Sequence, residues 1–181
     1  MKRVLVRSIM FISSCFPLYV LLLVSQVDKL SSVPIWYAVN YILVLSLLMG
    51  ISIVSVILLK KVPIGSYCKP THVRKPDRKV IHYVLVMLLP AIGFSLDKPS
   101  TVIIAILWLL MWGVLYVKMD WIYMNPLWVL FGYVAYEYDG GYLVTDIPYY
   151  ELEKLKENLR GCYLSNQVFV AHKKNVREDL S

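Results

Sequence analysis

Four long apolar segments occupy the first two thirds of the chain, and charged residues gather between them. The segments cover about residues 4–24, 36–59, 80–96 and 101–117. An α-helix rises about 1.5 Å per residue, so roughly 17–25 apolar residues cross the hydrocarbon layer of a membrane. The pattern therefore predicts an all-α bundle of four transmembrane helices within residues 1–120.

The charges between these segments alternate, and the alternation predicts their orientation. The N-terminus and the second loop are basic, whereas the first and third loops each hold one lysine beside one aspartate. Cytoplasmic loops carry the excess of Lys and Arg. We expect both termini and the second loop to be cytoplasmic. The second loop holds seven cations: Lys60, Lys61, Lys69, Arg74, Lys75, Arg78 and Lys79.

Prolines and small residues inside the segments suggest how the helices bend and pack. Pro17 and Pro90 predict kinks or local unwinding in the first and third spans. Ser46 and Gly50 lie four residues apart in the second span, a spacing that lets another helix approach closely. A cleaved signal peptide is an alternative for the first segment, although its end offers a poor small-residue cleavage site.

The pattern changes to that of a hairpin after residue 120. Leu127–Tyr138 and Tyr142–Ile147 are rich in β-branched and aromatic residues, which predicts two strands. Asp139-Gly140-Gly141 between them fits a tight turn that needs a positive φ. As an alternative, residues 121–136 form a fifth membrane span.

A helix and a third strand are expected after the hairpin. Leucines recur at helical spacing, with Asp146 as the expected cap and Gly161 as the expected end; they are Leu152, Leu155 and Leu159. The apolar residues within Cys162–Ala171 predict the third strand. Residues 121–181 thus form a predicted cytoplasmic α+β domain of β-β-α-β order. We expect it to lean on the membrane helices or on other subunits, because so short a chain is close to the lower limit for an independent core.

Composition narrows the possible functions. Hydrophobic residues make up 59% and charged residues 17% of the chain, and the net charge is +7. Soluble domains average roughly 45–50% and 25%, so a disordered chain is excluded and a soluble globule is disfavoured. The three cysteines lie far apart, as expected on a reduced cytoplasmic face. No acid lies in the middle of a span, which argues against a pump or secondary transporter.

Candidate catalytic residues are scarce. The sequence lacks a phosphate-binding glycine loop, a GxSxG motif and an HExxH motif. Cys68 and His72 share the basic loop and suggest at most a nucleophile pair or half of a metal site. Glu137, Asp139 and Asp146 fit solvated turns better than a cation site. We therefore predict no catalytic residue, no metal site and no cofactor, and a protein that is not an enzyme.

The seven cations of the second loop are the strongest local feature. Anionic lipid attracts such a cluster, by about 1 kcal/mol per residue near the membrane surface. An acidic protein partner is an alternative, and a topology marker without further function is the simplest interpretation. Only Tyr67 interleaves with the cations, so we expect no direct nucleic-acid binding through base stacking.

A motif after the fourth segment resembles a known family. The run begins Met124-Asn125-Pro126-Leu127, continues through Phe131-Gly132-Tyr133 and ends at Tyr136-Glu137. Together with four spans and a basic middle loop, it resembles the KwaA membrane subunits of the Kiwa anti-phage defence system. The resemblance covers the whole chain as an architecture and residues 124–137 as a motif.

This resemblance implies a function that the residues alone do not. It implies a non-enzymatic inner-membrane sensor and scaffold that forms a homo-oligomer. Such a protein works with a cytosolic DNA-binding partner, KwaB, to block phage replication or transcription. An oligomeric channel or membrane-perturbing effector is the alternative, and an enzyme comes third. Polar residues that could line a pore between several copies are Ser13, Ser14, Asn40, Ser46, Ser52 and Ser55.

Overall fold

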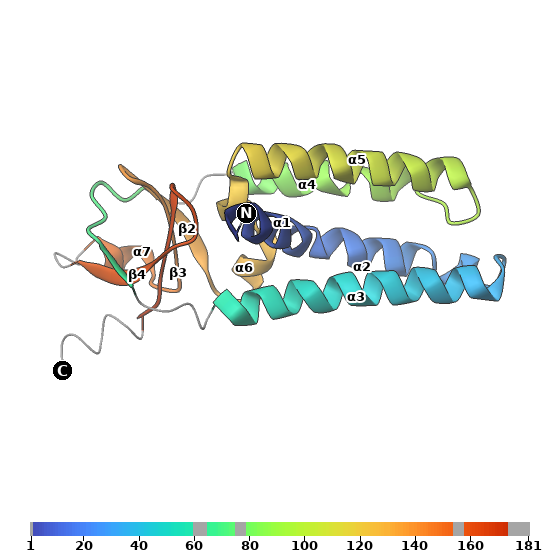
Figure 1. Cartoon of the computed structure of the whole chain (residues 1–181), viewed down its shortest axis with the longest axis horizontal. Coiled ribbons are helices and arrows are strands. Elements are labelled where there is room, and N and C mark those ends of the chain that lie inside the picture. Colours follow the sequence, from blue (N-terminus) through green and yellow to red (C-terminus); the bar gives the residue numbers. More distant parts are fainter. Residues whose placement is uncertain (1, 60–64, 75–78, 154–157, 174–181) are drawn as a thin grey trace.

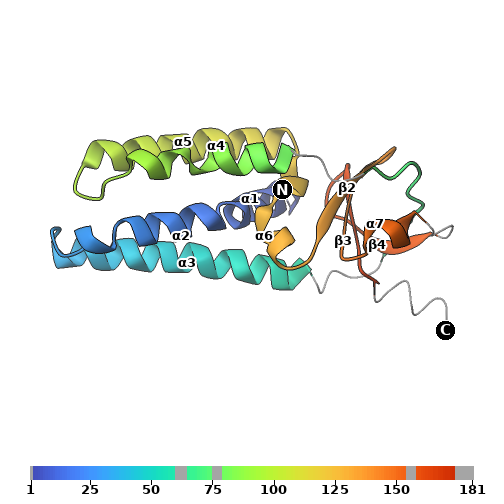
Figure 2. The same cartoon turned by 180° about the vertical axis from the view of Figure 1, so that it is seen from behind.

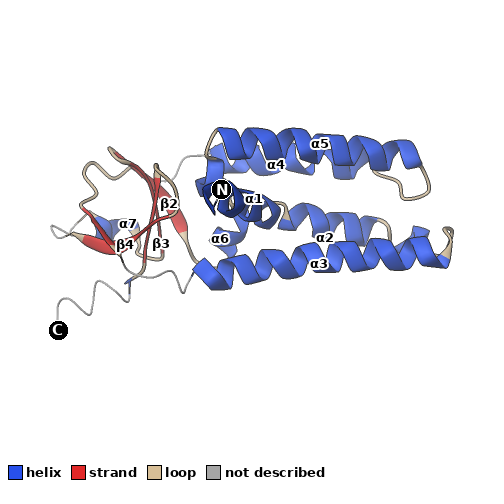
Figure 3. Cartoon of the chain, viewed as in Figure 1, coloured by secondary structure: helices blue, strands red, loops and turns tan. Residues whose placement is uncertain are grey.

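The computed structural model describes residues 2–59, 65–74, 79–153 and 158–173. Its helices run side by side along the long axis, and its strands gather at one end of them (Figures 1 and 3). The view from behind shows the same division (Figure 2). The main helices are α1 (Lys2–Ser14), α2 (Phe16–Ser25), α3 (Ile35–Leu59), α4 (Lys79–Gly93) and α5 (Pro99–Lys118).

The first predicted span is broken into two helices. The α1 helix ends at Ser14 and α2 begins at Phe16, with a bend of 41° between them. Pro17 sits in the first turn of α2, where its missing N–H costs no helical hydrogen bond. The predicted kink near Pro17 is therefore confirmed. The α4 helix, in contrast, continues through Pro90 and ends at Gly93.

Within the described residues, two helices are long and apolar enough to cross a membrane by themselves. They are Ile35–Leu58 and Pro99–Lys118, and the bent pair of α1 and α2 makes a third if it counts as one crossing. Val80–Gly93 is apolar but shorter. It ends three residues before the predicted boundary at residue 96.

Residues 121–136 do not form a fifth span. They form the short helix η2 (Trp121–Met124), the five-residue helix α6 (Pro126–Leu130) and the beginning of a strand. Pro126 starts α6 and Gly132 follows it with φ +82°, a conformation that favours glycine. The predicted strand over 127–138 was therefore wrong in its first half.

The strands form one five-stranded sheet of order β1-β4-β5-β3-β2. All neighbours are antiparallel except β3 and β5, which are parallel. The β2–β3 hairpin is confirmed, with Tyr138 opposite Gly141. The sheet also takes a strand from the segment between α3 and α4, which the sequence did not predict. The strands are β1 (Ser66–Cys68), β2 (Val134–Tyr138), β3 (Gly141–Thr145), β4 (Leu159–Tyr163) and β5 (Val168–Ala171).

The segment after the hairpin differs from the prediction. Helix α7 (Tyr149–Leu152) is short, and Leu159 begins β4 instead of ending a helical stripe. Leu155 lies outside the described residues. Pro148, and not the predicted Asp146, occupies the cap position of α7. The Asp146 carboxylate instead accepts a hydrogen bond from the Lys173 backbone N–H at 2.7 Å.

The expected third strand is a pair of strands. Gly161 lies within β4, where a Cβ would come within 2.0 Å of the Val170 carbonyl oxygen, so glycine is required by close strand packing. The predicted single strand Cys162–Ala171 is the end of β4 and all of β5, joined at residues 164–167.

The sheet is buried on both faces. Val144, Val168 and Val170 belong to the same core as the helices. Leu143 and Phe169 alternate with them and face a second core beneath α7 and the segment after β1. The expectation that the small domain leans on the helices is confirmed by this shared core.

Candidate functional site at the junction of helices and sheet

Asn125 lies at the centre of the junction and is 1% exposed. Its Oδ1 accepts a hydrogen bond from the Leu127 backbone N–H at 3.0 Å and so caps α6. Its Nδ2 donates to Ser13 Oγ at 3.1 Å and to the Met10 carbonyl at 3.4 Å, both on α1. One buried amide thus fixes α6 to the N-terminal helix.

The rest of the motif carries the chain from α6 into the sheet. The Gly132 N–H bonds to the Val129 carbonyl at 3.0 Å and ends the helix. Tyr133 is buried, and its hydroxyl lies 3.2 Å from His172 Nδ1 just after β5. The motif therefore connects α1, α6 and the C-terminal end of the sheet.

An ion pair ties α1 to the end of α5. Arg7 Nε lies 3.0 Å from Asp120 Oδ1, and Arg7 Nη1 donates to the Val117 carbonyl at 3.3 Å. The two side chains are 22% and 12% exposed. Asp120 has φ +57°, which aspartate tolerates better than most residues. A cation near the last carbonyls of α5 also suits the helix dipole.

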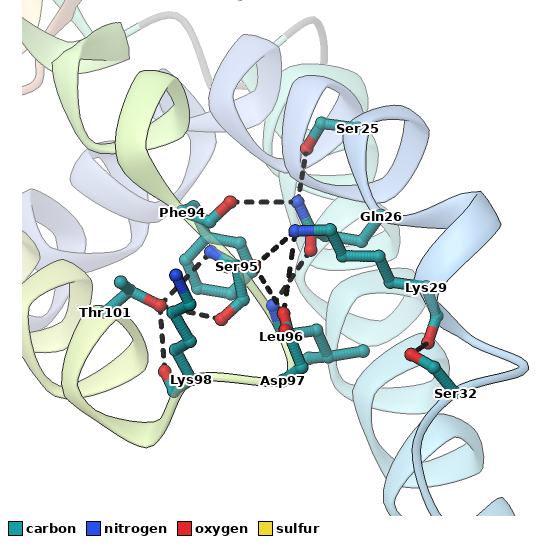
Figure 4. Close-up of polar contacts among 10 residues, drawn as sticks. All are labelled: Ser25, Gln26, Lys29, Ser32, Phe94, Ser95, Leu96, Asp97, Lys98 and Thr101. Atoms are coloured by element: carbon teal, nitrogen blue, oxygen red, sulfur yellow. Dashed lines mark hydrogen bonds and ion pairs between the residues drawn. The ribbon is translucent and has the colours of Figure 1, made fainter.

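A polar cluster joins the turns at the opposite end of the helices, away from the sheet (Figure 4). Gln26, at the end of α2, is buried and donates through Nε2 to the Phe94 carbonyl at 3.1 Å. Its Oε1 accepts from the Leu96 N–H at 2.9 Å. Lys29, in the short helix η1 (Val27–Lys29), bonds to Ser95 and lies 3.5 Å from Asp97. The cluster therefore holds the α2–α3 turn against the α4–α5 turn.

Asp97 is the anionic member of this cluster. Its Oδ1 accepts a hydrogen bond from Ser95, and this bond is the main reason why its pKa is lowered from 3.8, with Lys29 adding to the effect. Asp97 is therefore the group through which acid would weaken the contact between the two turns.

A family model now identifies the chain. The model described as anti-phage protein KwaA matches residues 6–170, more than nine tenths of the sequence. The chain belongs to the KwaA family of anti-phage proteins. Comparisons with curated proteins and with solved structures gave no match. The KwaA match spans both the helices and the sheet, so it includes the junction motif, the Arg7–Asp120 pair and the polar cluster at the far end.

The basic residues predicted to bind lipid or a partner are described only in part. Lys69 and Arg74 are exposed, and Lys79 begins α4. The Arg74 N–H bonds to the Glu137 carbonyl at 2.8 Å, so the segment after β1 crosses to the opposite edge of the sheet. Four predicted residues lie outside the described residues: Lys60, Lys61, Lys75 and Arg78.

The predicted small-residue pair faces outward. Ser46 and Gly50 are both exposed on α3, and a Cβ at Gly50 would meet nothing within 4 Å. Within the described residues the pair is therefore not a close-packing site between helices, and its role between chains stays a prediction.

Most of the polar residues that a channel could use lie inside one chain. Ser13, Ser14, Ser52 and Ser55 are buried. Ser52 Oγ donates to the Leu48 carbonyl at 2.7 Å, and Ser14 Oγ lies 2.8 Å from the Tyr83 hydroxyl. Asn40 and Ser46 are exposed. The serines act here as helix-packing groups.

The structure does not join Cys68 to His72. Cys68 is buried beside Tyr138 and Tyr163, whereas His72 is exposed with φ +52°. Burial raises the pKa of Tyr138, and its hydrogen bond with Cys68 adds to the rise. Among the described residues, no three His, Cys, Asp or Glu side chains lie close enough together to hold a metal ion.

The three acidic candidates each have their own surroundings. Asp139 Oδ2 accepts a hydrogen bond from Thr71 Oγ1 at 3.1 Å, and the Asp146 carboxylate accepts one from the Lys173 N–H. Glu137 lies in β2.

Sequence reasoning missed the ion pair at the junction and the cluster at the far end. Arg7 is the single charge inside the first apolar segment, and Asp120 lies three residues after the fourth segment, beyond Lys118. Opposite charges at the same predicted end of two helices were the available signal. Gln26 gave no comparable signal, because its partners are backbone groups of a distant turn.

Proposed function

We propose that the chain is a multi-pass protein of the bacterial inner membrane that acts as a non-enzymatic sensor and scaffold in anti-phage defence. The observation that carries the proposal is the apolar outer surface of helices joined, through a buried junction, to a compact sheet. Of the 18 most apolar consecutive residues in each helix, only 22% are buried in α3 and only 11% in α5. A soluble protein rarely exposes so large an apolar surface.

The helix lengths support four crossings. At about 1.5 Å per residue, the 20 residues of α5 span roughly 30 Å, the thickness of a bilayer core. The bent pair of α1 and α2 forms one crossing and α3 another. The 15 residues of α4 form the fourth with its flanking residues, since local thinning of the bilayer accommodates a short apolar helix.

The arrangement of the ends supports a cytoplasmic sheet. The N-terminus, the end of α3, the start of α4 and the end of α5 all lie at the sheet end of the helices (Figure 1). The basic residues of the second loop lie in the sequence between the end of α3 and the first turn of α4, both of which are at this end. Positive charge marks the cytoplasmic side. Both termini are therefore cytoplasmic in the proposed orientation.

The edge of the sheet at β1 and the segment after it offer a docking region for a cytosolic partner. Tyr67 on edge strand β1 is 59% exposed and accepts a hydrogen bond from Arg160 Nε at 2.9 Å. Lys69 and Arg74 follow in the same segment. Tyrosine and arginine are enriched among residues that dominate binding energy, and flanking charges set partner choice and association rate. The resemblance to KwaA implies a DNA-binding protein as this partner.

The test is co-purification of the cytosolic partner from cells that express the complete defence system, together with phage plating efficiency. Tyr67→Ala should reduce recruitment and protection at least tenfold. Tyr150→Ala removes an equally large side chain that is 63% exposed and serves as the matched control. Reversal of Arg74, Lys75 and Arg78 to Glu should abolish recruitment, whereas their change to Gln should leave membrane insertion intact.

Two outcomes would contradict the proposal. Full recruitment and protection in both Tyr67→Ala and the triple Glu variant would show that the partner does not dock on this surface. A reporter fused after Ser181 that is active only in the periplasm would contradict the orientation. Each variant is compared at equal membrane levels.

We also propose that the exposed face of α3 joins copies of the chain. Small residues at Ser46 and Gly50 let two helices approach closely. Light scattering of detergent-purified protein should give a multimer, and Ser46→Leu with Gly50→Leu should lower its mass. A monomeric mass at several protein concentrations would refute this contact.

A further inference from the structure

A cavity of about 590 Å³ lies between the first turns of α4 and the segment that enters the sheet. This volume is within the usual range of about 300–1,000 Å³ for small-molecule sites. Its walls come from α4, α6 and the start of β2. They include Ile81, Val84, Leu85, Trp128, Val129 and Ala135.

The polar groups of the cavity wall are largely committed to the protein. Asn125 uses its amide to cap α6 and to bind α1. The Tyr133 hydroxyl interacts with His172. None of the described residues that line the cavity carries a charge. A charged soluble ligand would therefore find no counter-ion here.

One polar atom in the wall lacks a partner. Trp128 is 1% exposed, and its Nε1–H has no hydrogen-bond acceptor among the described residues. A buried donor without a partner costs about 1–3 kcal/mol. The Nε1 atom is enclosed by the protein, so an occupant of the cavity meets a largely apolar wall and is itself apolar along its length.

We propose that the cavity binds one acyl chain of a membrane phospholipid. This inference rests on the proposed membrane location. The cavity is continuous with the apolar surface of α4, where Ile81 and Leu85 are 61% and 60% exposed. Val129 and Leu130 add exposed apolar surface beside it. Its place at the sheet end of the helices is the depth at which lipid ester groups lie.

The bound chain would contact both α4 and β2. It would therefore add apolar contacts to the junction between the helices and the sheet. The position of the sheet on the helices then depends on the lipid around the protein as well as on Asn125.

The test uses full-length protein in vesicles of phosphatidylethanolamine and phosphatidylglycerol with a trace of phospholipid that carries a photoreactive diazirine in one acyl chain. After illumination, mass spectrometry locates the adducts. Adducts should be at least fivefold denser in residues 80–85 and 126–135 than in the exposed faces of α3 and α5. Ala135→Trp should reduce this labelling at least fivefold.

Controls keep the test decisive. Leu107→Trp adds the same ring to a position that is 60% exposed on α5 and away from the cavity, and should leave labelling unchanged. Val84→Phe is a milder filling variant if Ala135→Trp fails to fold.

The outcomes separate the two proposals. Protein that alkaline carbonate removes from the vesicles would refute the membrane function. Inserted protein with even labelling over all exposed helix faces would refute the lipid site alone. Crosslinks that join two chains at the cavity would show a second copy as its occupant and would also overturn the proposal.

Discussion

Replacement of Asn125 tests whether one amide holds the junction together. Asn125→Ala removes the α6 cap, worth about 1 kcal/mol, and the bond to Ser13, worth about 1 kcal/mol more. The 3.4 Å contact with the Met10 carbonyl is long and adds little. The expected loss of about 2 kcal/mol lowers the melting temperature by roughly 4–8 °C in a chain of this size.

Asn125→Asp separates the two ends of the amide. The introduced carboxyl keeps the acceptor that caps α6 but loses the donor to α1. It also places a charge in a buried site beside the Met10 carbonyl, where the Leu127 N–H is a partner on one side, and desolvation of this charge costs several kcal/mol. Burial raises the pKa of such a carboxyl, so protonation relieves the cost as pH falls. The variant should therefore melt lower than Asn125→Ala at pH 8 and recover part of the difference at pH 5.

The assay is thermal unfolding of the purified protein in one detergent, followed by circular dichroism. Asn40→Ala is the matched control, because Asn40 is exposed and bonds only to the Trp36 carbonyl of its own helix in the described structure. Its effect should stay within about 0.5 kcal/mol. A melting temperature of Asn125→Ala within 1 °C of the wild type would refute the argument. So would an Asn125→Asp variant more stable than Asn125→Ala at pH 8.

Three further predictions concern the other contacts. Arg7→Met and Asp120→Asn should be non-additive in a double-mutant cycle of unfolding, with a coupling of about 1–2 kcal/mol, and additive effects would show no interaction. Asp97→Asn should lower the melting temperature at neutral pH. Because the pKa of Asp97 is lowered in the folded protein, the difference in melting temperature between variant and wild type should shrink below pH 3.8. A difference that stays constant with pH would refute this. Cys68→Ser and His72→Ala should each keep phage protection within a few-fold at normal protein levels, and complete loss in either would reveal a missed site.

The helices could be predicted from sequence because their signal is local. A run of apolar residues is visible without knowledge of the fold, and α3 and α5 begin and end within two residues of the predicted spans. The break at Cys15 followed from Pro17. The early end of α4 at Gly93 did not, because the turn after it is set by contacts with Gln26.

The sheet was harder to predict because its pattern depends on distant pairing. Leu159 fits the spacing of a helix with Leu152, yet in β4 it lies opposite Cys68 of the neighbouring strand β1. Three residues from the second loop complete the sheet, and nothing in Ser66–Cys68 alone marks an edge strand. Gly161 was interpreted as a helix end, although its reason is the approach of Val170. Each error comes from a long-range contact that outweighs local preference.

The two-sided burial of the sheet decides which experiments can test a scaffold. A sheet that shares Val144, Val168 and Val170 with the helix core cannot be removed without exposing that core. Deletion from residue 124 onward would also remove the Asn125 bonds to α1 and the sheet neighbours of β1. Loss of protection in such a truncation would follow from an unstable helix core as readily as from a lost partner. Exposed substitutions such as Tyr67→Ala leave both cores intact, so a loss of recruitment in them is specific to the surface.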